Sequence, residues 1–192
     1  MEVNLPEPER PRERRRSVAR VCIVGAESTG KTTLAAALAV HYDTVWVPEY
    51  GAPYHHVGRG DPHRPWAPDE FVHIARIREW FEEFLAGYAN RVLFCDTDTF
   101  VTAVFNEVYL GTRNEELEQE ARAHRYSLYI LCDVDTPFHA DKLGLRREEA
   151  RQKMHQRYAD YVRSTGSPWL ELSGPHEERM KLATTAIDGL IS

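Results

Sequence analysis

One stretch near the start of the chain limits the possible folds more than any other: residues 25–32, which read Gly-Ala-Glu-Ser-Thr-Gly-Lys-Thr. The stretch meets every fixed position of the pattern G-x-x-x-x-G-K-[ST], and it stands between an apolar run at 18–24 and a helical pattern. Gly25 and Gly30 let the backbone wrap closely around an oxyanion, because glycine adopts positive φ without strain and has no Cβ. The sequence therefore predicts a strand, a phosphate-binding loop and a helix, in preference to a glycine-rich turn without a ligand.

The residues that follow the second glycine supply the rest of the phosphate chemistry. A helix beginning near Lys31 offers unpaired N–H groups and the positive end of its dipole. Lys31 adds a mobile cation for the β- and γ-phosphates, and Thr32 offers a hydroxyl to Mg²⁺. We expect the nucleotide to be held by eight residues of this region: Gly25, Glu27, Ser28, Thr29, Gly30, Lys31, Thr32 and Thr33.

The length and charge of the chain favour one domain with a small partner. A chain of 192 residues can bury a sufficient core without disulfides or a structural metal. Its 24 basic and 30 acidic residues give a net charge of −6, which argues against a dedicated nucleic-acid or membrane-surface protein. No stretch approaches 18 consecutive apolar residues. The cysteines Cys22, Cys95 and Cys132 each lie in an apolar run, as buried thiols in a reducing cytosol do. We therefore expect a cytoplasmic protein, and its oligomeric state stays open.

The first 17 residues differ in composition from the rest. They hold three prolines and five arginines among glutamates, with almost nothing apolar to bury. Such a segment cannot offset the entropy of ordering, so we expect a disordered charged tail at 1–17 and a single folded domain at 18–192. The interleaved glutamates favour a solvated tail over one that binds nucleic acid or anionic lipid.

The remaining chain alternates strand-like and helical patterns. Expected strands are the apolar runs at 18–24, 44–47, 91–95, 127–132 and 168–172, and helical spacing fills most of the intervals. This alternation predicts an α/β fold, in which helices cover both faces of a five-stranded parallel sheet in three layers. Residues 51–67 hold three prolines and three histidines, and we expect them to form an irregular loop over the acceptor site.

Acidic residues follow two of the expected strands. Glu49 comes after the run at 44–47, while Asp96 and Asp98 follow the run at 91–95. Ligands of open α/β sheets bind beyond the carboxyl ends of the strands, so these side chains are expected near the phosphate loop. Glu49 is a candidate general base, with a surface glutamate as the alternative. Asp96 and Asp98 compete for Mg²⁺, and for Asp98 the alternative is a cap on the next helix.

Cations follow the fourth expected strand. Residues 133–144 contain Pro137 and Gly144 and lead into a basic helical pattern that begins with Arg146 and Arg147. We expect a helical lid here, because arginines that close over a nucleotide neutralise charge that Mg²⁺ leaves on a transferring phosphoryl group. Arg146 is the expected catalytic cation and Arg147 a nucleotide contact, whereas a solvated helix face is the alternative for most of the run.

Four motifs together resemble the nicotinamide-riboside kinase domain of the bacterial NAD-biosynthesis regulator. They are the loop with Glu27 at its third position, Glu-Tyr-Gly at 49–51, Asp-Thr-Asp-Thr-Phe at 96–100, and the lid at 135–146. The resemblance extends from about Arg20 to the last residue. It implies the P-loop fold of nucleoside and nucleotide kinases, ATP with Mg²⁺ as the phosphate donor, and the ribose 5′-hydroxyl of nicotinamide riboside as the acceptor. Glu49, Tyr50, Trp66 and Asp98 are then expected on the acceptor side.

Two other functions stay open. A nucleotide-dependent switch or regulatory ATPase would bind a protein partner through its loops, but it would need neither a base at Glu49 nor an aromatic loop around Trp66. A kinase of this type could also act on another nucleoside or on a nucleoside monophosphate. A nucleic-acid end is a weaker candidate, because the net charge is negative.

Overall fold

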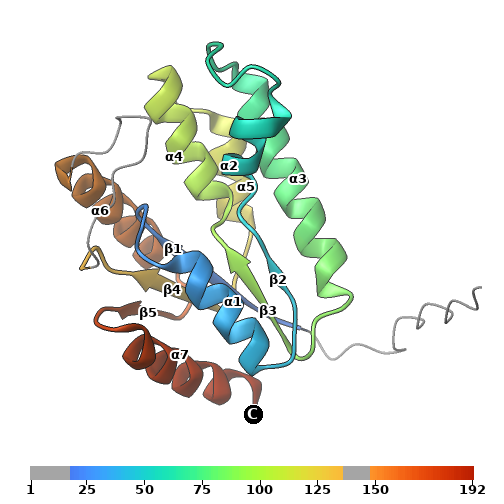
Figure 1. The fold of residues 1–192 in the computed structure, drawn as a ribbon, viewed down its shortest axis with the longest axis vertical. Coiled ribbons are helices and arrows are strands. Elements are labelled where there is room, and N and C mark those ends of the chain that lie inside the picture. Colours follow the sequence, from blue (N-terminus) through green and yellow to red (C-terminus); the bar gives the residue numbers. More distant parts are fainter. Residues whose placement is uncertain (1–17, 136–147) are drawn as a thin grey trace, which may run out of the picture.

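Five parallel strands form one sheet in the order β2-β3-β1-β4-β5. We describe the chain from a computed structural model, in which residues 18–135 and 148–192 are described (Figure 1). The expected tail at 1–17 and most of the expected lid, with Arg146 and Arg147, lie outside these residues. The strands are β1 Ala19–Gly25, β2 Trp46–Val47, β3 Val92–Asp96, β4 Leu128–Cys132 and β5 Trp169–Leu172. The predicted five-stranded parallel sheet is confirmed.

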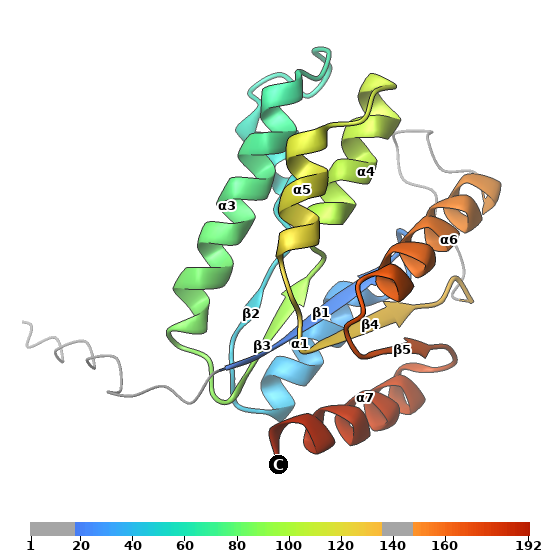
Figure 2. The ribbon, with the colours of Figure 1, turned by 180° about the vertical axis from the view of Figure 1, so that it is seen from behind.

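Helices cover both faces of the sheet, as Figures 1 and 2 show from opposite sides. Helices α1 and α7 pack on one face, and α3, α4 and α6 pack on the other. None of the described helices is long and apolar enough to cross a membrane. The helical elements are α1 Lys31–His41, α2 Gly51–Pro53, the π-helical turn η1 Tyr54–Gly58, α3 Pro68–Ala86, α4 Thr99–Leu110, α5 Glu115–Ala123, α6 Glu148–Ser164 and α7 His176–Ile191.

The central strand β1 contributes side chains to the hydrophobic core on both faces of the sheet. Val21 and Ile23 pack towards α1 and α7, whereas Cys22 and Val24 pack towards α3, α4 and α6. Because side chains alternate along a strand, a strand buried on both faces is apolar throughout. The same reason explains why the three cysteines, each in a strand, are buried free thiols.

Two elements differ from the sequence-based expectation. Strand β2 is shorter than the run at 44–47, since the hydroxyl of Thr44, and not its backbone, bonds to Val92 O at 2.7 Å. The segment 51–67 begins with helical turns, α2 and η1, where we expected an irregular loop. The Glu49 carboxylate accepts bonds from the N–H groups of Gly51 and Ala52, and a proline at position 53 is tolerated in a first helical turn.

The sheet brings three chain segments to one place. In the strand register, Ile23 of β1 lies beside Asp96 of β3, and Val47 of β2 lies beside Cys95. The phosphate loop, Glu49 and Asp96 therefore leave three adjacent parallel strands at the same edge, as expected for ligand sites in open α/β sheets.

Candidate active site

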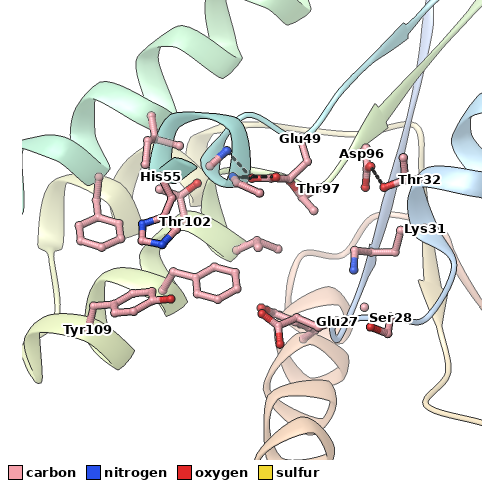
Figure 3. A pocket seen from close by; sticks show the side chains of 18 of the residues that line it. Glu27, Ser28, Lys31, Thr32, Glu49, His55, Asp96, Thr97, Thr102 and Tyr109 are labelled. Atoms are coloured by element: carbon pink, nitrogen blue, oxygen red, sulfur yellow. Dashed lines mark hydrogen bonds between the residues drawn. The ribbon is translucent and has the colours of Figure 1, made fainter. Parts of the chain in front are cut away.

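A cavity of about 420 Å³ opens at this edge of the sheet (Figure 3). The phosphate loop and the end of β3 form one end of it, and aromatic side chains from η1, α3 and α4 form the other. The residues that line it include Gly25, Glu27, Ser28, Lys31, Thr32, Glu49, His55, His56, Trp66, Phe71, Asp96, Thr97, Thr102, Phe105, Tyr109 and Tyr158. The phosphate loop and the expected acceptor side thus share one cavity.

The phosphate loop is a tight backbone cradle. Gly25 has a φ of 151°, and a Cβ at this position would lie 2.6 Å from the carbonyl oxygen of Cys132, so only glycine fits. Gly30 has a φ of 82°, and Ser28 also adopts a positive φ of 58°. Lys31 folds back over the loop, with its Nζ 2.8 Å from Ala26 O. This is the concave arrangement of successive peptide units that binds anions.

Thr32 and Asp96 hold side by side two oxygen atoms of the kind that a hard cation prefers. The Thr32 hydroxyl donates to Asp96 Oδ2 at 2.5 Å, and Asp96 is only 1% exposed. The other carboxylate oxygen, Oδ1, is buried without a hydrogen-bond partner among the described residues. Burial raises the pKa of Asp96, and the Thr32 hydroxyl and the Lys31 cation partly oppose that rise. A Mg²⁺ ion bound through these oxygens would satisfy the orphaned Oδ1, so the residues fit this ion.

Asp98 occupies a different position from the one expected of a substrate ligand. Its Oδ1 accepts a bond from Val101 N at 3.0 Å, which makes it the N-cap of α4, and its Oδ2 accepts a bond from the Tyr129 hydroxyl at 3.1 Å. Asp98 is not among the residues that line the cavity. The structure therefore favours the helix-cap alternative, because a left-handed residue, Thr97 with a φ of 72°, separates the two acids.

Tyr50 is likewise absent from the residues that line the cavity, although it was expected on the acceptor side. Its ring lies against the rings of Tyr54, His73 and Phe81, at centroid separations of 5.9 to 6.3 Å. Tyr50 thus packs η1 onto α3, while its neighbour Glu49 faces the cavity.

Glu49 stands between the two ends of the cavity (Figure 3). Its carboxylate accepts bonds from the N–H groups of Gly51 and Ala52. Burial raises the pKa of Glu49, and the Asp96 carboxylate adds to that rise, although the two backbone bonds and Lys31 oppose it. A raised pKa makes a carboxylate a stronger base at neutral pH.

Aromatic side chains build the far end of the cavity around Trp66. The Arg59 guanidinium lies 3.9 Å from the ring centroid of Trp66, and the His55 ring stacks on Trp66 at 5.5 Å and 19°. Phe71 and Tyr109 complete the wall, with centroids 4.7 and 5.3 Å from Trp66. Sequence analysis identified Trp66 but missed Tyr109, which the i, i+4 pair of aromatic residues at 105 and 109 on α4 could have indicated.

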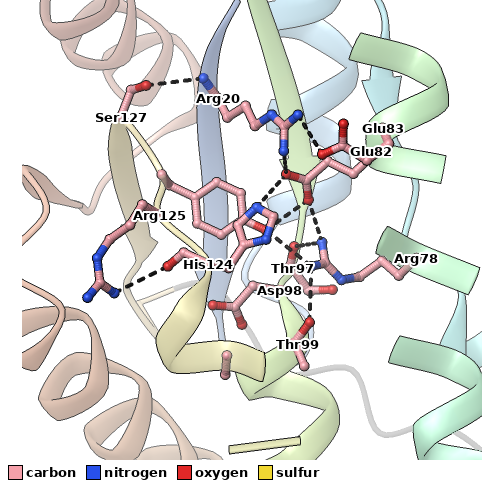
Figure 4. A network of polar contacts seen from close by, with 12 residues as sticks. Arg20, Arg78, Glu82, Glu83, Thr97, Asp98, Thr99, His124, Arg125 and Ser127 are labelled. Atoms are coloured by element: carbon pink, nitrogen blue, oxygen red, sulfur yellow. Dashed lines mark hydrogen bonds and ion pairs between the residues drawn. The ribbon is translucent and has the colours of Figure 1, made fainter. Parts of the chain in front are cut away.

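A buried polar network supports the loop that carries Asp96 (Figure 4). Arg78 of α3 donates to Thr97 O at 3.2 Å and to Glu82 Oε2 at 3.1 Å. Glu82 also accepts bonds from the Tyr126 hydroxyl at 2.9 Å and from the His124 ring at 2.7 Å. Burial alone would raise the pKa of Glu82, but these partners outweigh it and lower the pKa to about 2. The carbonyl of the left-handed residue Thr97 is therefore fixed by Arg78, whose charge is paired with that of Glu82.

Comparison with known proteins places the chain among P-loop proteins. A family model described as an AAA domain matches residues 20–179. The trifunctional NAD biosynthesis/regulator protein NadR of Salmonella typhimurium and that of Escherichia coli are each 34% identical over 126 residues. The matched region covers 66% of this chain but only 30% of either relative. The chain therefore matches less than a third of the length of these relatives.

Solved structures show the same fold. NadR in complex with NR has a TM-score of 0.71 and 22% identity, over 91% of this chain and 52% of that one. NadR in complex with NAD and AMP-PNP has a TM-score of 0.68 and 21% identity, over 91% and 50%. A thymidylate kinase from Ehrlichia chaffeensis has a TM-score of 0.65 and 11% identity, over 90% and 100%. The expected fold of P-loop nucleoside and nucleotide kinases is confirmed.

Proposed function

We propose that the chain, which belongs to the AAA-domain family whose model matches residues 20–179, is a kinase that uses ATP with Mg²⁺ and phosphorylates the ribose 5′-hydroxyl of nicotinamide riboside to give nicotinamide mononucleotide. One observation carries the proposal: the phosphate loop and an aromatic acceptor wall face each other in one cavity, with Glu49 between them. The 34% identity to two NadR proteins and the likeness in fold to a NadR structure in complex with NR support the choice of substrate.

The donor end of the cavity suits a nucleoside triphosphate. The backbone of the loop cradles the phosphates, and the Lys31 ammonium leaves Ala26 O to contact them. Thr32 and Asp96 would hold Mg²⁺, which supplies positive charge to the phosphate oxygens when it is bound. Phosphoryl transfer requires little beyond positioning and charge stabilisation, and these residues provide both.

Glu49 is the proposed base. A ribose hydroxyl has a pKa far above 7 and loses its proton during transfer, so a carboxylate at hydrogen-bond distance both aligns the oxygen and accepts the proton. The backbone bonds from Gly51 and Ala52 fix the carboxylate in place, which limits its freedom to leave the cavity.

The aromatic wall suits the ring of the acceptor. The nicotinamide ring of the riboside is flat and positively charged, and the faces of aromatic side chains attract such a ring. Trp66, His55 and Tyr109 present such side chains at the end of the cavity away from the phosphate loop. With the ring of the acceptor against this wall, its ribose would lie between the wall and Glu49.

A coupled assay of ADP release tests the function. The purified chain is supplied with ATP, Mg²⁺ and one acceptor at a time: nicotinamide riboside, adenosine, deoxynucleosides or nucleoside monophosphates. We expect fastest release with nicotinamide riboside and a product with the mass of nicotinamide mononucleotide, and Lys31→Ala serves as the control for contaminating kinases. Faster phosphorylation of another acceptor would identify that acceptor as the substrate in place of nicotinamide riboside. ATP hydrolysis without any phosphorylated acceptor would favour a regulatory ATPase.

A further inference from the structure

Five consecutive carbonyl oxygens of the phosphate loop, at 26–30, accept hydrogen bonds. Ala26 O accepts bonds from the side chains of Thr29 and Lys31, and Gly30 O accepts the first α1 bond, from Leu34 N at 2.9 Å. The three carbonyls between them, at 27–29, accept bonds from two arginine side chains that lie more than 120 residues further along the chain. These arginines were not among the expected nucleotide contacts.

Arg179 of α7 contacts the C-terminal part of the loop. Its Nη1 donates to Thr29 O at 2.8 Å and its Nε to Gly174 O at 2.8 Å. Its Nη2 donates to the carboxylate of Asp135, which also accepts a bond from Gly174 N. Arg179 is 4% exposed, and its guanidinium donates to three segments of the chain: the phosphate loop, the loop after β5 and Asp135.

Arg151 of α6 contacts the N-terminal part of the loop. Its Nε donates to Glu27 O at 2.9 Å, and its Nη2 reaches Ser28 O at 3.5 Å. Glu148 lies 3.2 Å from Nη1, one turn earlier on the same helix. Arg151 is 5% exposed, although most of the neighbouring charged residues of α6 are exposed or half-exposed.

We propose that Arg151 and Arg179, which we call the arginine clamp, are positioning residues that set the affinity of the phosphate loop for phosphate. A peptide unit is planar and trans, so its carbonyl and N–H point in opposite directions. Guanidinium groups that hold the carbonyls of 27–29 outward therefore turn the N–H groups of the same peptide units towards the cavity. The role rests on the proposed nucleotide-binding function of this loop, but it does not depend on which acceptor is phosphorylated.

The geometry explains why these positions are occupied by arginine. A guanidinium offers several N–H donors in one rigid plane, so one side chain joins the loop to two further segments. Arg179 connects Thr29 both to the loop after β5 and to Asp135, the last described residue after β4. Ser28, with its positive φ, lies in the part of the loop that Arg151 contacts. Without these bonds, the loop would have to be ordered by the ligand, at a cost in affinity.

Binding of three probes to the full chain tests the clamp. Titration calorimetry measures the dissociation constants of a non-hydrolysable ATP analogue, inorganic tripolyphosphate and adenosine for wild type, Arg151→Met and Arg179→Met. Arg163→Met on α6 and Lys181→Met on α7 are controls, because both positions are far less buried. We expect each clamp variant to weaken the ATP analogue and tripolyphosphate about tenfold or more, with less than about a twofold change for adenosine.

Two further variants separate positioning from charge and from folding. Arg179→Lys keeps the charge but cannot bond to Thr29, Gly174 and Asp135 at once, so we expect it to recover little of the phosphate affinity. If lysine restored wild-type binding, charge alone would account for the effect and the proposal would be overturned. Asp135→Asn leaves Arg179 in place but removes its ionic partner, and we expect weaker tripolyphosphate binding in this variant even if Arg179→Met does not fold.

Thermal melts accompany each titration. Unchanged tripolyphosphate affinity in folded clamp variants, or an equal loss for adenosine, would overturn the proposal, because a merely structural role affects all three probes alike. These binding results are separate from the kinase assay, so a chain that binds tripolyphosphate through the clamp but phosphorylates no acceptor would contradict the proposed function alone.

Discussion

The Thr32 hydroxyl donates a 2.5 Å hydrogen bond to Asp96 Oδ2 and thereby joins the second residue of α1 to the last residue of β3. The two residues are 64 positions apart in the chain, and the pairing of β1 with β3 brings them together. Asp96 keeps its other oxygen buried and without a hydrogen-bond partner among the described residues. The structure therefore holds two oxygen atoms, of the kind that Mg²⁺ prefers, side by side in the lining of the cavity.

This relationship predicts that the acids at 96 and 98 respond differently to the same substitution. Asp96→Asn replaces the proposed charged ligand of Mg²⁺ by a neutral one, so we expect the Mg²⁺ concentration for half-maximal turnover to rise about tenfold or more. Asp98→Asn is the matched control, because asparagine caps a helix about as well as aspartate, and its Mg²⁺ dependence should stay that of the wild type. Equal Mg²⁺ curves for both variants would remove Asp96 from the metal site.

Lys31 is predicted to act in transfer and not in folding. Its ammonium bonds to Ala26 O, a carbonyl that also accepts a bond from the Thr29 hydroxyl, so the loop keeps its shape in Lys31→Ala. We expect turnover to fall by about 10²-fold or more, as when one electrostatic contact to a reacting group is removed, while the melting temperature changes little. Lys181→Ala on the surface of α7 is the control. A variant with normal turnover would contradict the assignment of Lys31.

Local patterns were enough to predict the sheet and the phosphate loop. The strands at the centre of the sheet are buried on both faces, so each appears in the sequence as a short continuous apolar run, and the loop requires glycine at two fixed positions. The ends of the strands gave Glu49 and Asp96, because parallel strands place their carboxyl ends at one edge. The side-chain directions of Asp98 and Tyr50 depend on single backbone turns, such as the left-handed Thr97, that no periodicity reports.

Contacts made across long stretches of sequence could not be predicted. The arginine clamp joins residues more than 120 positions apart, and Arg151 appeared in the sequence only as one cation in a basic helical run. Helix α2 was also missed, because its stabilising bonds come from the side chain of Glu49 and not from a helical pattern. The arginine clamp arises from tertiary packing, whereas the start of α2 depends on local bonds from the Glu49 carboxylate to backbone N–H groups two and three residues further on.

Glu82 should make stability depend on pH in the acid range. Its pKa is lowered from the ordinary value of 4.5 to about 2, so its charged form stabilises the fold above about pH 4.5, and this contribution is lost as pH falls towards about 2. Glu82→Gln breaks a buried charge network, so the free energy of unfolding of this variant should be lower than that of the wild type by about 3 kcal/mol or more at pH 7. Urea unfolding from pH 7 to pH 3.5 should show this difference shrinking below about pH 4.5. The exposed Glu79→Gln on the same helix should show almost no difference at any pH, and a pH-independent cost at Glu82 would contradict the prediction.

Trp66 should affect the KM for the acceptor and not the KM for ATP. Its ring forms the centre of the aromatic wall, so Trp66→Ala removes the side chain around which that wall is packed. We expect the KM for nicotinamide riboside to rise about tenfold, while the KM for ATP stays within about twofold of wild type. Trp80→Ala, which alters an exposed ring of α3, is the control. A rise in the KM for ATP alone would place Trp66 on the donor side.

A substitution at Glu49 distinguishes a kinase from a nucleotide-dependent switch. Its carboxylate lies in the cavity between the phosphate loop and the aromatic wall, and burial raises its pKa above the ordinary value of 4.5. Glu49→Gln keeps the shape of the side chain and a carbonyl oxygen for the N–H groups of Gly51 and Ala52, but the amide cannot accept a proton. We therefore expect nearly unchanged ATP affinity and a kcat reduced by about 10²-fold or more.

The pH dependence of turnover provides the second measurement on Glu49. If this carboxylate is the base, wild-type kcat falls at acid pH as Glu49 takes up a proton, with a midpoint above 4.5 because its pKa is raised. In Glu49→Gln the residual kcat should lose this acid limb and become flat over the same range. The profiles are measured with nicotinamide riboside at saturating ATP, together with nucleotide titrations of both proteins. An acid limb that persists unchanged in the variant would assign it to another group and would leave Glu49 as a helix cap alone.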